Sequence, residues 1–568
     1  MSITPEATKA FQMWLEDPGI DEATKRELRA IADQPKEIED RFFKDLEFGT
    51  GGLRGLIGAG TNRMNLYTVG RATQGLAQHL LQQGAGGCPV VIAYDSRRMS
   101  PEFALEAALV LAGNGIAAYV FDALRPTPEL SFAVRELKAA AGIVITASHN
   151  PPEYNGYKVY GPDGGQLVPD DARKVTEQIA RVTSFAQVRK LPRQEAEAKR
   201  LLRWIGDEID RKYIDAVTAI SPNAPLIAQM KEPLRIVYTP LHGAGNHAVR
   251  RALKQAGFAQ VTVVPEQERP DSEFSTVKSP NPEEREAFTL ALKWAEQVGA
   301  DIVIGTDPDC DRMGAVVRDS SGRYQILTGN QAGALMVHYL LGSLQAKGAL
   351  PDNGVVIKTI VTGEMGAHIA RHYGMATINT LTGFKYIGEK ITEFEQTGAH
   401  RFLFGYEESY GYLAGTHCRD KDAVVASMLI CEAAAYYKMQ GKTLIDVLEE
   451  LYRQYGYFRE QLESLTLKGK EGLEKINGTM EKWRNAPPAQ IGGLRVAAVE
   501  DYRLGLYGLP KENVLKYKLE DGSWFCLRPS GTEPKLKVYF GVRGDSMQAA
   551  DDLLKRLVDE VMAKVKAS

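Results

Sequence analysis

Four short segments of the chain place hydroxyl, carboxylate or basic side chains directly after apolar runs that are typical of buried strands. In open α/β sheets, ligands bind beyond the carboxyl ends of the strands, so residues of these types predict a ligand site at such an edge. Each segment alone is also compatible with a polar surface turn. The segments are TASHNP (146–151), GTDPDCDR (305–312), GYEES (405–409) and RPSGTEPK (528–535).

The second segment carries three aspartates at alternate positions, Asp307, Asp309 and Asp311. In an extended segment they would face the same side, and their mutual repulsion calls for a hard cation such as Mg²⁺. A calcium EF-hand begins with the same spacing but needs Gly at its sixth position and Glu at its twelfth. Arg312 and Arg318 occupy those places, which excludes the EF-hand. An exposed acidic turn is the remaining alternative.

The other segments carry groups suited to a sugar and to a phosphate. Glu407 and Ser409 offer an acceptor and a donor to neighbouring sugar hydroxyls, and Lys421 follows them in the chain. A guanidinium fork, hydroxyls and backbone N–H groups suit a phosphate dianion, and residues 528–535 supply them from Arg528, Ser530, Gly531 and Thr532.

The sequence contains no ordinary nucleotide-binding fingerprint. FGTGGLRG (48–55) sets Arg54 among glycines that permit close approach of the backbone to a ligand. Arg54 stands where G-x-G-x-x-G needs its third glycine, and no Walker A sequence occurs. A dinucleotide or a triphosphate loop is therefore not predicted.

Length and composition indicate a multidomain protein of the cytoplasm. The chain has 568 residues, enough for about three to five domains. Lys plus Arg number 69 and Asp plus Glu 72, a net charge of -3 that argues against nucleic-acid and membrane-surface partners. Five scattered cysteines without CxxC spacing fit a reducing compartment. No signal peptide or membrane span is expected.

A strand–helix–strand pattern occurs three times and predicts three similar α/β domains with mixed sheets. A smaller α+β domain follows, with alternating strands and a closing amphipathic helix at 545–565. A charged stretch at 185–213 is expected to be a helical connector. The predicted boundaries are 1–205, with TASHNP; 206–325, with the aspartates; 326–455, with GYEES; and 456–568, with RPSGTEPK.

All four segments, in this order, resemble the loops of the α-D-phosphohexomutase superfamily: phosphoserine, metal, sugar and phosphate loops respectively. The motifs FGTGGLRG, DPDCDR and GYEESYGY are most similar to those of the phosphoglucomutase/phosphopentomutase branch. Pro308 and Cys310 replace glycines of the commoner pattern, whereas the three aspartates are kept. The resemblance covers essentially the whole chain and implies that the four domains surround a central cleft.

The resemblance also implies a role for each matched residue. Ser148 would carry a phosphoryl group and, with Asp307, Asp309 and Asp311, hold Mg²⁺. The residues flanking that group would be Arg54, His149, Lys158 and Arg312, and His149 and Lys158 are both open as the general base. Substrate would be held by Lys385, Glu407, Ser409, Lys421, Arg528, Ser530, Gly531 and Thr532.

The implied activity is the interconversion of glucose 1-phosphate and glucose 6-phosphate through a phosphoserine enzyme, with glucose 1,6-bisphosphate as intermediate and activator. A phosphopentomutase or a phosphomannomutase is the alternative, and a sugar-bisphosphate synthase or a non-catalytic sugar-phosphate sensor is less favoured. A Mg²⁺-dependent phosphatase would not need separate sugar and phosphate loops. The sequence does not determine the oligomeric state or the rank order of hexose and pentose phosphates.

Overall fold

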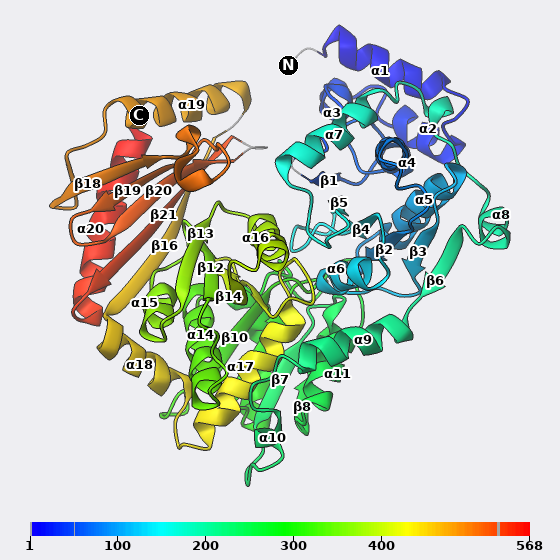
Figure 1. Ribbon diagram of the computed structural model, residues 1–568. Helices are drawn as coiled ribbons and strands as arrows, with labels where there is room; N and C mark the ends of the chain where they lie inside the picture. Colours follow the sequence, from blue (N-terminus) through cyan, green and yellow to red (C-terminus); the bar gives the residue numbers. More distant parts are fainter. Residues whose placement is uncertain (1–2, 50, 468, 531–533, 568) are drawn as a thin grey trace. The chain divides into compact units, whose positions relative to one another are not determined.

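The structure is a computed structural model that describes residues 3–49, 51–467, 469–530 and 534–567 (Figure 1). Contacts divide the chain into two compact units. Unit 1 contains the chain up to Val316, together with Ile387–Gly398 and Gly411–Ala435. Unit 2 contains Val317–Tyr386, Ala399–Tyr410 and the chain from Tyr436 onward.

Unit 1 begins with three helices around an aromatic cluster in which Trp14 contacts Phe42, Tyr67 and Phe185 edge to face. Thr4 and Asp21 cap the first two helices through side-chain oxygens, and a proline starts the first and the third. The helices are α1 (Pro5–Glu16), α2 (Glu22–Arg29) and α3 (Pro35–Phe42).

The first sheet of unit 1 has the strand order β1-β5-β4-β2-β3-β6. Strands β4, β2, β3 and β6 pair in parallel, and β5 pairs antiparallel with both of its neighbours, β4 and β1. Its strands are β1 (Gly52–Leu56), β2 (Val90–Tyr94), β3 (Ala118–Phe121), β4 (Ala141–Ile145), β5 (Tyr154–Tyr160) and β6 (Leu202–Ile205). Its helices are α4 (Leu66–Gln82), α5 (Ser100–Gly113), α6 (Thr127–Glu136), α7 (Pro169–Ala180) and α8 (Arg193–Ala198). Strands β2 and β4 are entirely buried, as expected for parallel strands covered by helices.

The charged stretch at 185–213 is not a continuous helix, so the predicted helical connector is wrong. It contains the short helix α8 and then β6, which pairs in parallel with β3 and extends the first sheet. Charged side chains are compatible with this because β6 is an edge strand, where Arg203 and Trp204 are exposed.

Unit 1 also contains a second sheet, in which β10, β9, β7 and β8 are neighbours in that order and β7 is parallel to β8 and β9. Its strands are β7 (Arg235–Thr239), β8 (Gln260–Val263), β9 (Ile302–Thr306) and β10 (Met313–Arg318). The remaining helices and strand of this part are α9 (Asp207–Thr218), α10 (Ala224–Ile227), α11 (Gly245–Gln255), α12 (Pro265–Glu268), α13 (Thr289–Val298), α16 (Phe384–Thr397), β15 (Gly411–Ala414) and α17 (Ala423–Lys438).

Unit 2 contains a parallel group of strands in the order β13-β12-β14, packed with helices. The close approach of α14 to this sheet requires a glycine, because a Cβ at Gly333 would lie 2.6 Å from Cε2 of the Tyr406 ring and closer still to its Cδ2. The elements are β11 (Tyr324–Ile326), α14 (Gly329–Ala346), β12 (Gly354–Thr359), α15 (Met365–His372), β13 (Ala376–Thr380), β14 (Arg401–Glu407) and α18 (Leu444–Tyr455).

The carboxyl-terminal part of unit 2 is an antiparallel sheet in the order β16-β21-β20-β19-β18-β17, against which α19 and α20 pack (Figure 1). The stacked rings of Tyr517 and Phe525, with centroids 4.6 Å apart, lie in its core. The elements are β16 (Tyr457–Thr466), α19 (Gly469–Asn485), β17 (Gln490–Ile491), β18 (Leu494–Asp501), β19 (Leu515–Leu519), β20 (Trp524–Pro529), β21 (Lys535–Gly544) and α20 (Met547–Lys566).

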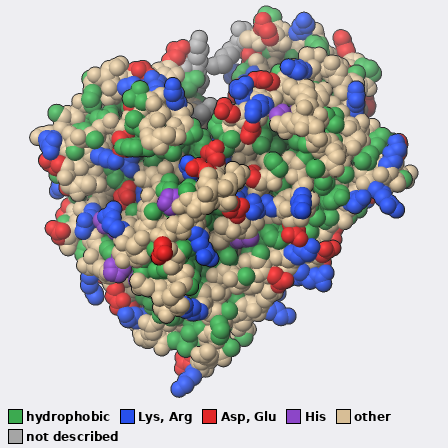
Figure 2. Space-filling model, in the orientation of Figure 1, with side chains coloured by type: hydrophobic (Ala, Val, Ile, Leu, Met, Phe, Trp, Pro, Cys, Tyr) green, Lys and Arg blue, Asp and Glu red, His purple; other side chains and the backbone are tan. Residues whose placement is uncertain are grey.

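Three α/β domains with mixed sheets and a smaller α+β domain are therefore confirmed, whereas the domain boundaries and the central cleft stay predictions. Figure 2 shows basic and acidic side chains interspersed over the visible face, in agreement with the small net charge. Within the described ranges, no helix combines the length and the apolar character that crossing a bilayer requires.

We expect Gly75→Ala to destabilise the protein, because a Cβ at Gly75 of α4 would lie 2.7 Å from both the backbone nitrogen and the Cα of Ile179 in α7. Overpacking of this kind costs about 1–3 kcal/mol. Gly478→Ala in α19 is the matched control, since an added Cβ there meets no described atom within 4 Å. The control should gain about 0.5–1 kcal/mol of helix stability. Equal shifts of the two denaturation midpoints would contradict the close α4–α7 contact.

Candidate active site

Ser148 lies just beyond β4, in a backbone conformation that is unusual for a side-chain-bearing residue. Its φ is 53°, in the left-handed region, where strain is typical of functional loops. Its backbone N–H donates to Thr146 Oγ1 at 2.8 Å, which fixes the turn. Its hydroxyl donates to Asp307 Oδ2 at 2.7 Å and lies 3.2 Å from His149 Nδ1. The Ser148 oxygen is thus held between an imidazole and a carboxylate.

The buried guanidinium of Arg97 holds the Ser148 loop in place. It donates to the carbonyl oxygens of Ser148 and Asn150, to Pro151 O at 2.8 Å and to Tyr154 O at 3.1 Å. Its charge is balanced by Asp95, whose Oδ2 lies 3.4 Å from Arg97 Nε. A single guanidinium with several rigid donors can satisfy a loop that makes few backbone bonds of its own.

The three aspartates lie in a tight turn rather than in an extended segment. Cys310 has a φ of 55°, and its N–H donates to Asp307 O at 2.9 Å. Asp307 Oδ1 accepts the N–H groups of Asp311 at 3.1 Å and of Arg312 at 3.0 Å. The expected alternation along a strand is therefore wrong, but the turn also brings the carboxylates together: one oxygen from each of the three lies within 4.8 Å of the others.

Burial and the neighbouring charges shift the pKa values of two aspartates in the turn. Burial and repulsion from Asp309 and Asp311 raise the pKa of Asp307 well above its usual value. Burial also acts to raise the pKa of Asp309, but the adjacent Lys158 ammonium outweighs burial and lowers it. The triad is thus arranged so that a positive charge near its oxygens is strongly favoured.

Two lysines and one threonine contact the triad. Lys158 Nζ lies 2.8 Å from Asp309 Oδ2 and 3.5 Å from Asp311 Oδ2, and Lys421 Nζ lies 3.1 Å from Asp311 Oδ2. Thr127 donates to Asp309 Oδ2 at 2.9 Å through its hydroxyl and to Asp309 O at 2.9 Å through its N–H. Burial lowers the pKa of Lys158, but Asp309 and Asp311 outweigh burial and raise it, so Lys158 stays charged.

The triad fits a bound cation. Asp309 Oδ1 and Asp311 Oδ1 are buried and accept no hydrogen bond from the described residues. Buried carboxylate oxygens without partners are costly, and a hard cation with oxygen ligands would satisfy them. Asp307, Asp309 and Asp311 could therefore hold a metal ion, and the Ser148 hydroxyl lies beside them.

The arginines predicted to flank Ser148 lie in unit 1 with it. Arg54 on β1 donates to Asn150 Oδ1 at 3.3 Å, and Arg312 forms an ion pair with Glu283 and lies 3.8 Å from Asp311 Oδ1. Burial, together with the positive charges of Arg312 and Arg54, lowers the pKa of His149 well below its usual value. The imidazole beside Ser148 is therefore neutral at neutral pH.

Other candidate residues belong to unit 2. Glu407 is buried at the end of β14, and its Oε1 accepts the Gly383 N–H at 2.8 Å, which ties GYEES to the segment directly before α16, whose first turn carries Lys385. Ser409 lies in the turn after β14. Arg528 Nε lies 3.4 Å from Glu512 Oε1, and the Ser530 N–H donates to Lys535 O at 2.7 Å. Gly531 and Thr532 lie outside the described residues.

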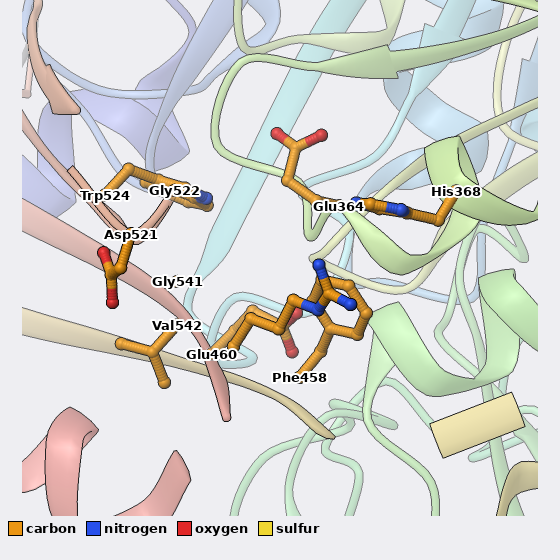
Figure 3. A pocket seen from close by; sticks show the side chains of 10 residues that line it. Glu364, His368, Phe458, Glu460, Asp521, Gly522, Trp524, Gly541 and Val542 are labelled. Carbon is orange, nitrogen blue, oxygen red and sulfur yellow. The ribbon is translucent and has the colours of Figure 1, made fainter. Parts of the chain in front are cut away.

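Unit 2 also contains a small hollow unrelated to these residues (Figure 3). Its lining includes Glu364 and His368 of the α15 region, Trp524 of β20 and Asp521 of the turn before β20. Its volume of about 90 Å³ holds a few water molecules but not a sugar phosphate.

Sequence reasoning missed four residues of the site. Arg97 follows β2 in the same way as Ser148 follows β4, so the strand-end argument could have found it. Asp420 precedes Lys421 and contacts it at 3.1 Å, and the Tyr160 hydroxyl donates to Asp420 at 2.8 Å. Thr127 begins α6 and is linked to Asp309 only through the tertiary fold, so no sequence signal points to it.

Four family models match the chain in succession. They describe the α/β/α domains I, II and III and the C-terminal domain of phosphoglucomutase/phosphomannomutase, and they match residues 45–185, 211–322, 328–455 and 474–563. This fold, with a serine hydroxyl beside an acidic triad, defines the class of phosphosugar mutases, which are isomerases. The chain belongs to the phosphoglucomutase/phosphomannomutase family, within the α-D-phosphohexomutase superfamily, and the predicted resemblance is confirmed.

Individual relatives agree with this assignment. A phosphoglucomutase of Staphylococcus haemolyticus is 40% identical over 521 residues, covering 90% of this chain and 92% of that protein. One of Staphylococcus aureus is 38% identical over 553 residues, covering 94% and 96%. Two solved structures share the fold. A putative phosphomannomutase of Thermus thermophilus has a TM-score of 0.68 at 22% identity, covering 92% of this chain and 99% of its own. Parafusin, a phosphoglucomutase of Paramecium, has a TM-score of 0.69 at 16% identity, covering 92% of this chain and 94% of its own.

We expect Asp307→Asn, Asp309→Asn and Asp311→Asn each to weaken divalent-metal binding while the fold is kept, because each removes one charged oxygen ligand. The loss should exceed the roughly 10- to 100-fold that removal of an outer partner costs. Calorimetric titration of Mg²⁺ measures it. Asp319→Asn, in the turn after β10, is the control and should bind as the unmodified chain does. Unchanged Mg²⁺ affinity in all three variants would contradict the assignment.

Proposed function

We propose that the chain interconverts glucose 1-phosphate and glucose 6-phosphate by way of a phosphoryl group on Ser148. The observation that supports this most is the 2.7 Å hydrogen bond from the Ser148 hydroxyl to Asp307, which sets a phosphorylatable oxygen at the edge of an acidic triad. The choice of glucose rests on the relatives, which are phosphoglucomutases. Phosphopentomutase and phosphomannomutase activity are the alternatives.

The mechanism follows from charge. A phosphoserine adds nearly two negative charges at neutral pH beside three aspartates. Mg²⁺ held by Asp307, Asp309, Asp311 and a phosphoryl oxygen of Ser148 would neutralise the transferring group. Lys158, 2.8 Å from Asp309, offsets the remaining charge, and Arg54 and Arg312 flank the group. Phosphoryl transfer asks mainly for such positioning and charge neutralisation.

His149 is the better candidate for the general base. Its imidazole is neutral and can accept the proton of an attacking sugar hydroxyl, and its Nδ1 lies 3.2 Å from Ser148 Oγ. Lys158 stays charged because Asp309 and Asp311 outweigh its burial, so it has no lone pair to offer. Lys158 then serves as an electrostatic stabiliser of the transferring group.

In the full reaction, Ser148 gives its phosphoryl group to the free hydroxyl of the sugar monophosphate. The resulting glucose 1,6-bisphosphate reverses its orientation in the site and returns its other phosphoryl group to Ser148. Glu407 and Ser409 would hold ring hydroxyls and Lys385 would face the substrate. The non-reacting phosphate would be bound by Lys421, Arg528, Ser530, Gly531 and Thr532. The partners are then small sugar phosphates in the cytoplasm, with no nucleic acid or membrane.

The active form should carry phosphate on Ser148, which peptide mass spectrometry would locate. We expect Ser148→Ala to lose mutase turnover, because it removes the hydroxyl that is hydrogen-bonded to Asp307 of the triad. Ser275→Ala, whose hydroxyl bonds Asp271 on the surface, is the control and should keep full activity. Full turnover by Ser148→Ala, with phosphate found elsewhere, would overturn the mechanism.

Glucose 1-phosphate should have a higher kcat/KM than ribose 1-phosphate at equal Mg²⁺ and bisphosphate, since a hexose separates its two phosphates by one more carbon.

Glu407→Gln keeps an acceptor for the Gly383 N–H but loses the charge. Losing a charged hydrogen bond to a sugar hydroxyl should cost about 1.5–3 kcal/mol, or about 10- to 100-fold in kcat/KM.

Glu463→Gln on β16 is the matched control and should leave both activities unchanged. A clear preference for ribose 1-phosphate would make the chain a phosphopentomutase. Unchanged kcat/KM for both sugars in Glu407→Gln would remove Glu407 from the sugar site.

A further inference from the structure

A cavity of about 710 Å³ lies in unit 2, lined both by the region of β12 and β13 and by the carboxyl-terminal sheet. Its volume is within the range of small-molecule sites. The cavity adjoins the smaller hollow of Figure 3, with which it shares Glu364 and Trp524. The described residues that line it include none of those assigned to the candidate active site. It is therefore a separate place at which a ligand could bind.

Lys516 on β19 is a buried cation whose ammonium group is incompletely hydrogen-bonded. Its side chain is only 4% exposed. Nζ donates to Ile360 O at 2.6 Å, lies 4.3 Å from the centroid of the Trp524 ring, and is 3.9 Å from Glu364 Oε1, beyond hydrogen-bond distance. An ammonium has three N–H donors, so two of them lack an acceptor among the described residues. Because Ile360, Glu364 and Trp524 all line the cavity, the ammonium lies at the cavity wall.

The nearest carboxylate compensates the charge of Lys516 only in part. Glu364 Oε1 accepts a hydrogen bond from the Lys358 ammonium at 3.0 Å, so one carboxylate is shared between two lysines. Burial and the positive charge of Lys358 lower the pKa of Lys516 to about 8, although Glu364 acts to raise it. An anionic group that accepts hydrogen bonds from Lys516 Nζ would supply the stabilisation that Glu364 does not.

The other lysine and the other carboxylate of the cavity satisfy each other. Glu500 on β18 accepts hydrogen bonds from the hydroxyls of Tyr502 at 3.0 Å and Tyr507 at 2.7 Å, and it forms an ion pair with Lys518 Nζ at 2.5 Å. Lys518 is therefore already paired with a carboxylate. Of the two lysines that line the cavity, Lys516 is the one with hydrogen-bond donors to offer a ligand.

We propose that this cavity binds a small organic monocarboxylate with an apolar or aromatic body. The carboxylate accepts hydrogen bonds from Lys516 Nζ, and the body packs against the apolar side chains of the lining, among them Ile378 and Leu509. A single negative charge fits best, because one ammonium group faces the ligand and the Glu364 carboxylate lies 3.9 Å from that ammonium and would repel a second charge.

Calorimetric titration of the full-length protein with naphthoate tests the proposal, and naphthamide is the matched neutral probe of the same shape. Neither probe contains a sugar or a phosphate, the groups for which the candidate active site is suited. We expect one equivalent of naphthoate to bind, and naphthamide to bind about 10- to 100-fold more weakly, since it lacks the charged partner for Lys516. Equal affinities for the two probes would overturn the proposal.

Two variants assign the binding to this cavity. Lys516→Met removes the charge and should weaken naphthoate binding about tenfold or more. Ala498→Trp, at an exposed position of β18 that lines the cavity, fills the space without removing a buried group and should abolish binding of both probes.

Lys564→Met and Ala563→Trp on α20 are the matched controls, because neither residue lines the cavity, and both should bind naphthoate as the unmodified chain does. The denaturation midpoint of each variant shows that it is folded, and Ala498→Trp decides the matter if Lys516→Met does not fold. The proposal is overturned if the unmodified chain takes up no naphthoate, or if either folded cavity variant binds it with full affinity.

Discussion

The repulsion among three buried carboxylates governs the candidate site. Asp307, Asp309 and Asp311 lie in one turn with almost no exposure to water, and charges in that setting interact far more strongly than on a surface. The surrounding groups reduce this repulsion. Lys158 and Lys421 supply positive charge, the Thr127 hydroxyl donates a hydrogen bond to Asp309, and N–H groups of the turn donate to Asp307. Asp309 Oδ1 and Asp311 Oδ1 still accept no hydrogen bond from the described residues, and a cation could bind there.

The sequence predicted most of the fold because buried strands and amphipathic helices have strong periodic patterns. All three strand–helix repeats and the smaller carboxyl-terminal sheet are present. The prediction failed at β6, where an edge strand with exposed Arg203 and Trp204 has the composition of a charged helix. Edge strands bury little, so their patterns carry less information than those of central strands.

Site prediction worked for residues that follow strands and failed for those held by tertiary contacts. Ser148 and the aspartates lie where the strand-end argument put them. Their supports come from elsewhere: Arg97 reaches the Ser148 loop from the end of β2, and Thr127 reaches Asp309 from α6. Such partners are separated by 51 to 182 residues in the chain, and periodicity within a segment cannot detect them.

The left-handed backbone at Ser148 limits which residue can occupy this position. Threonine has a hydroxyl of the same chemistry, but its branched Cβ is strongly disfavoured at a φ of 53°. Alanine or asparagine can adopt that conformation at lower cost but carries no hydroxyl. Serine combines a hydroxyl with an unbranched Cβ, so the backbone conformation limits which hydroxyl-bearing residue can stand at this position beside Asp307.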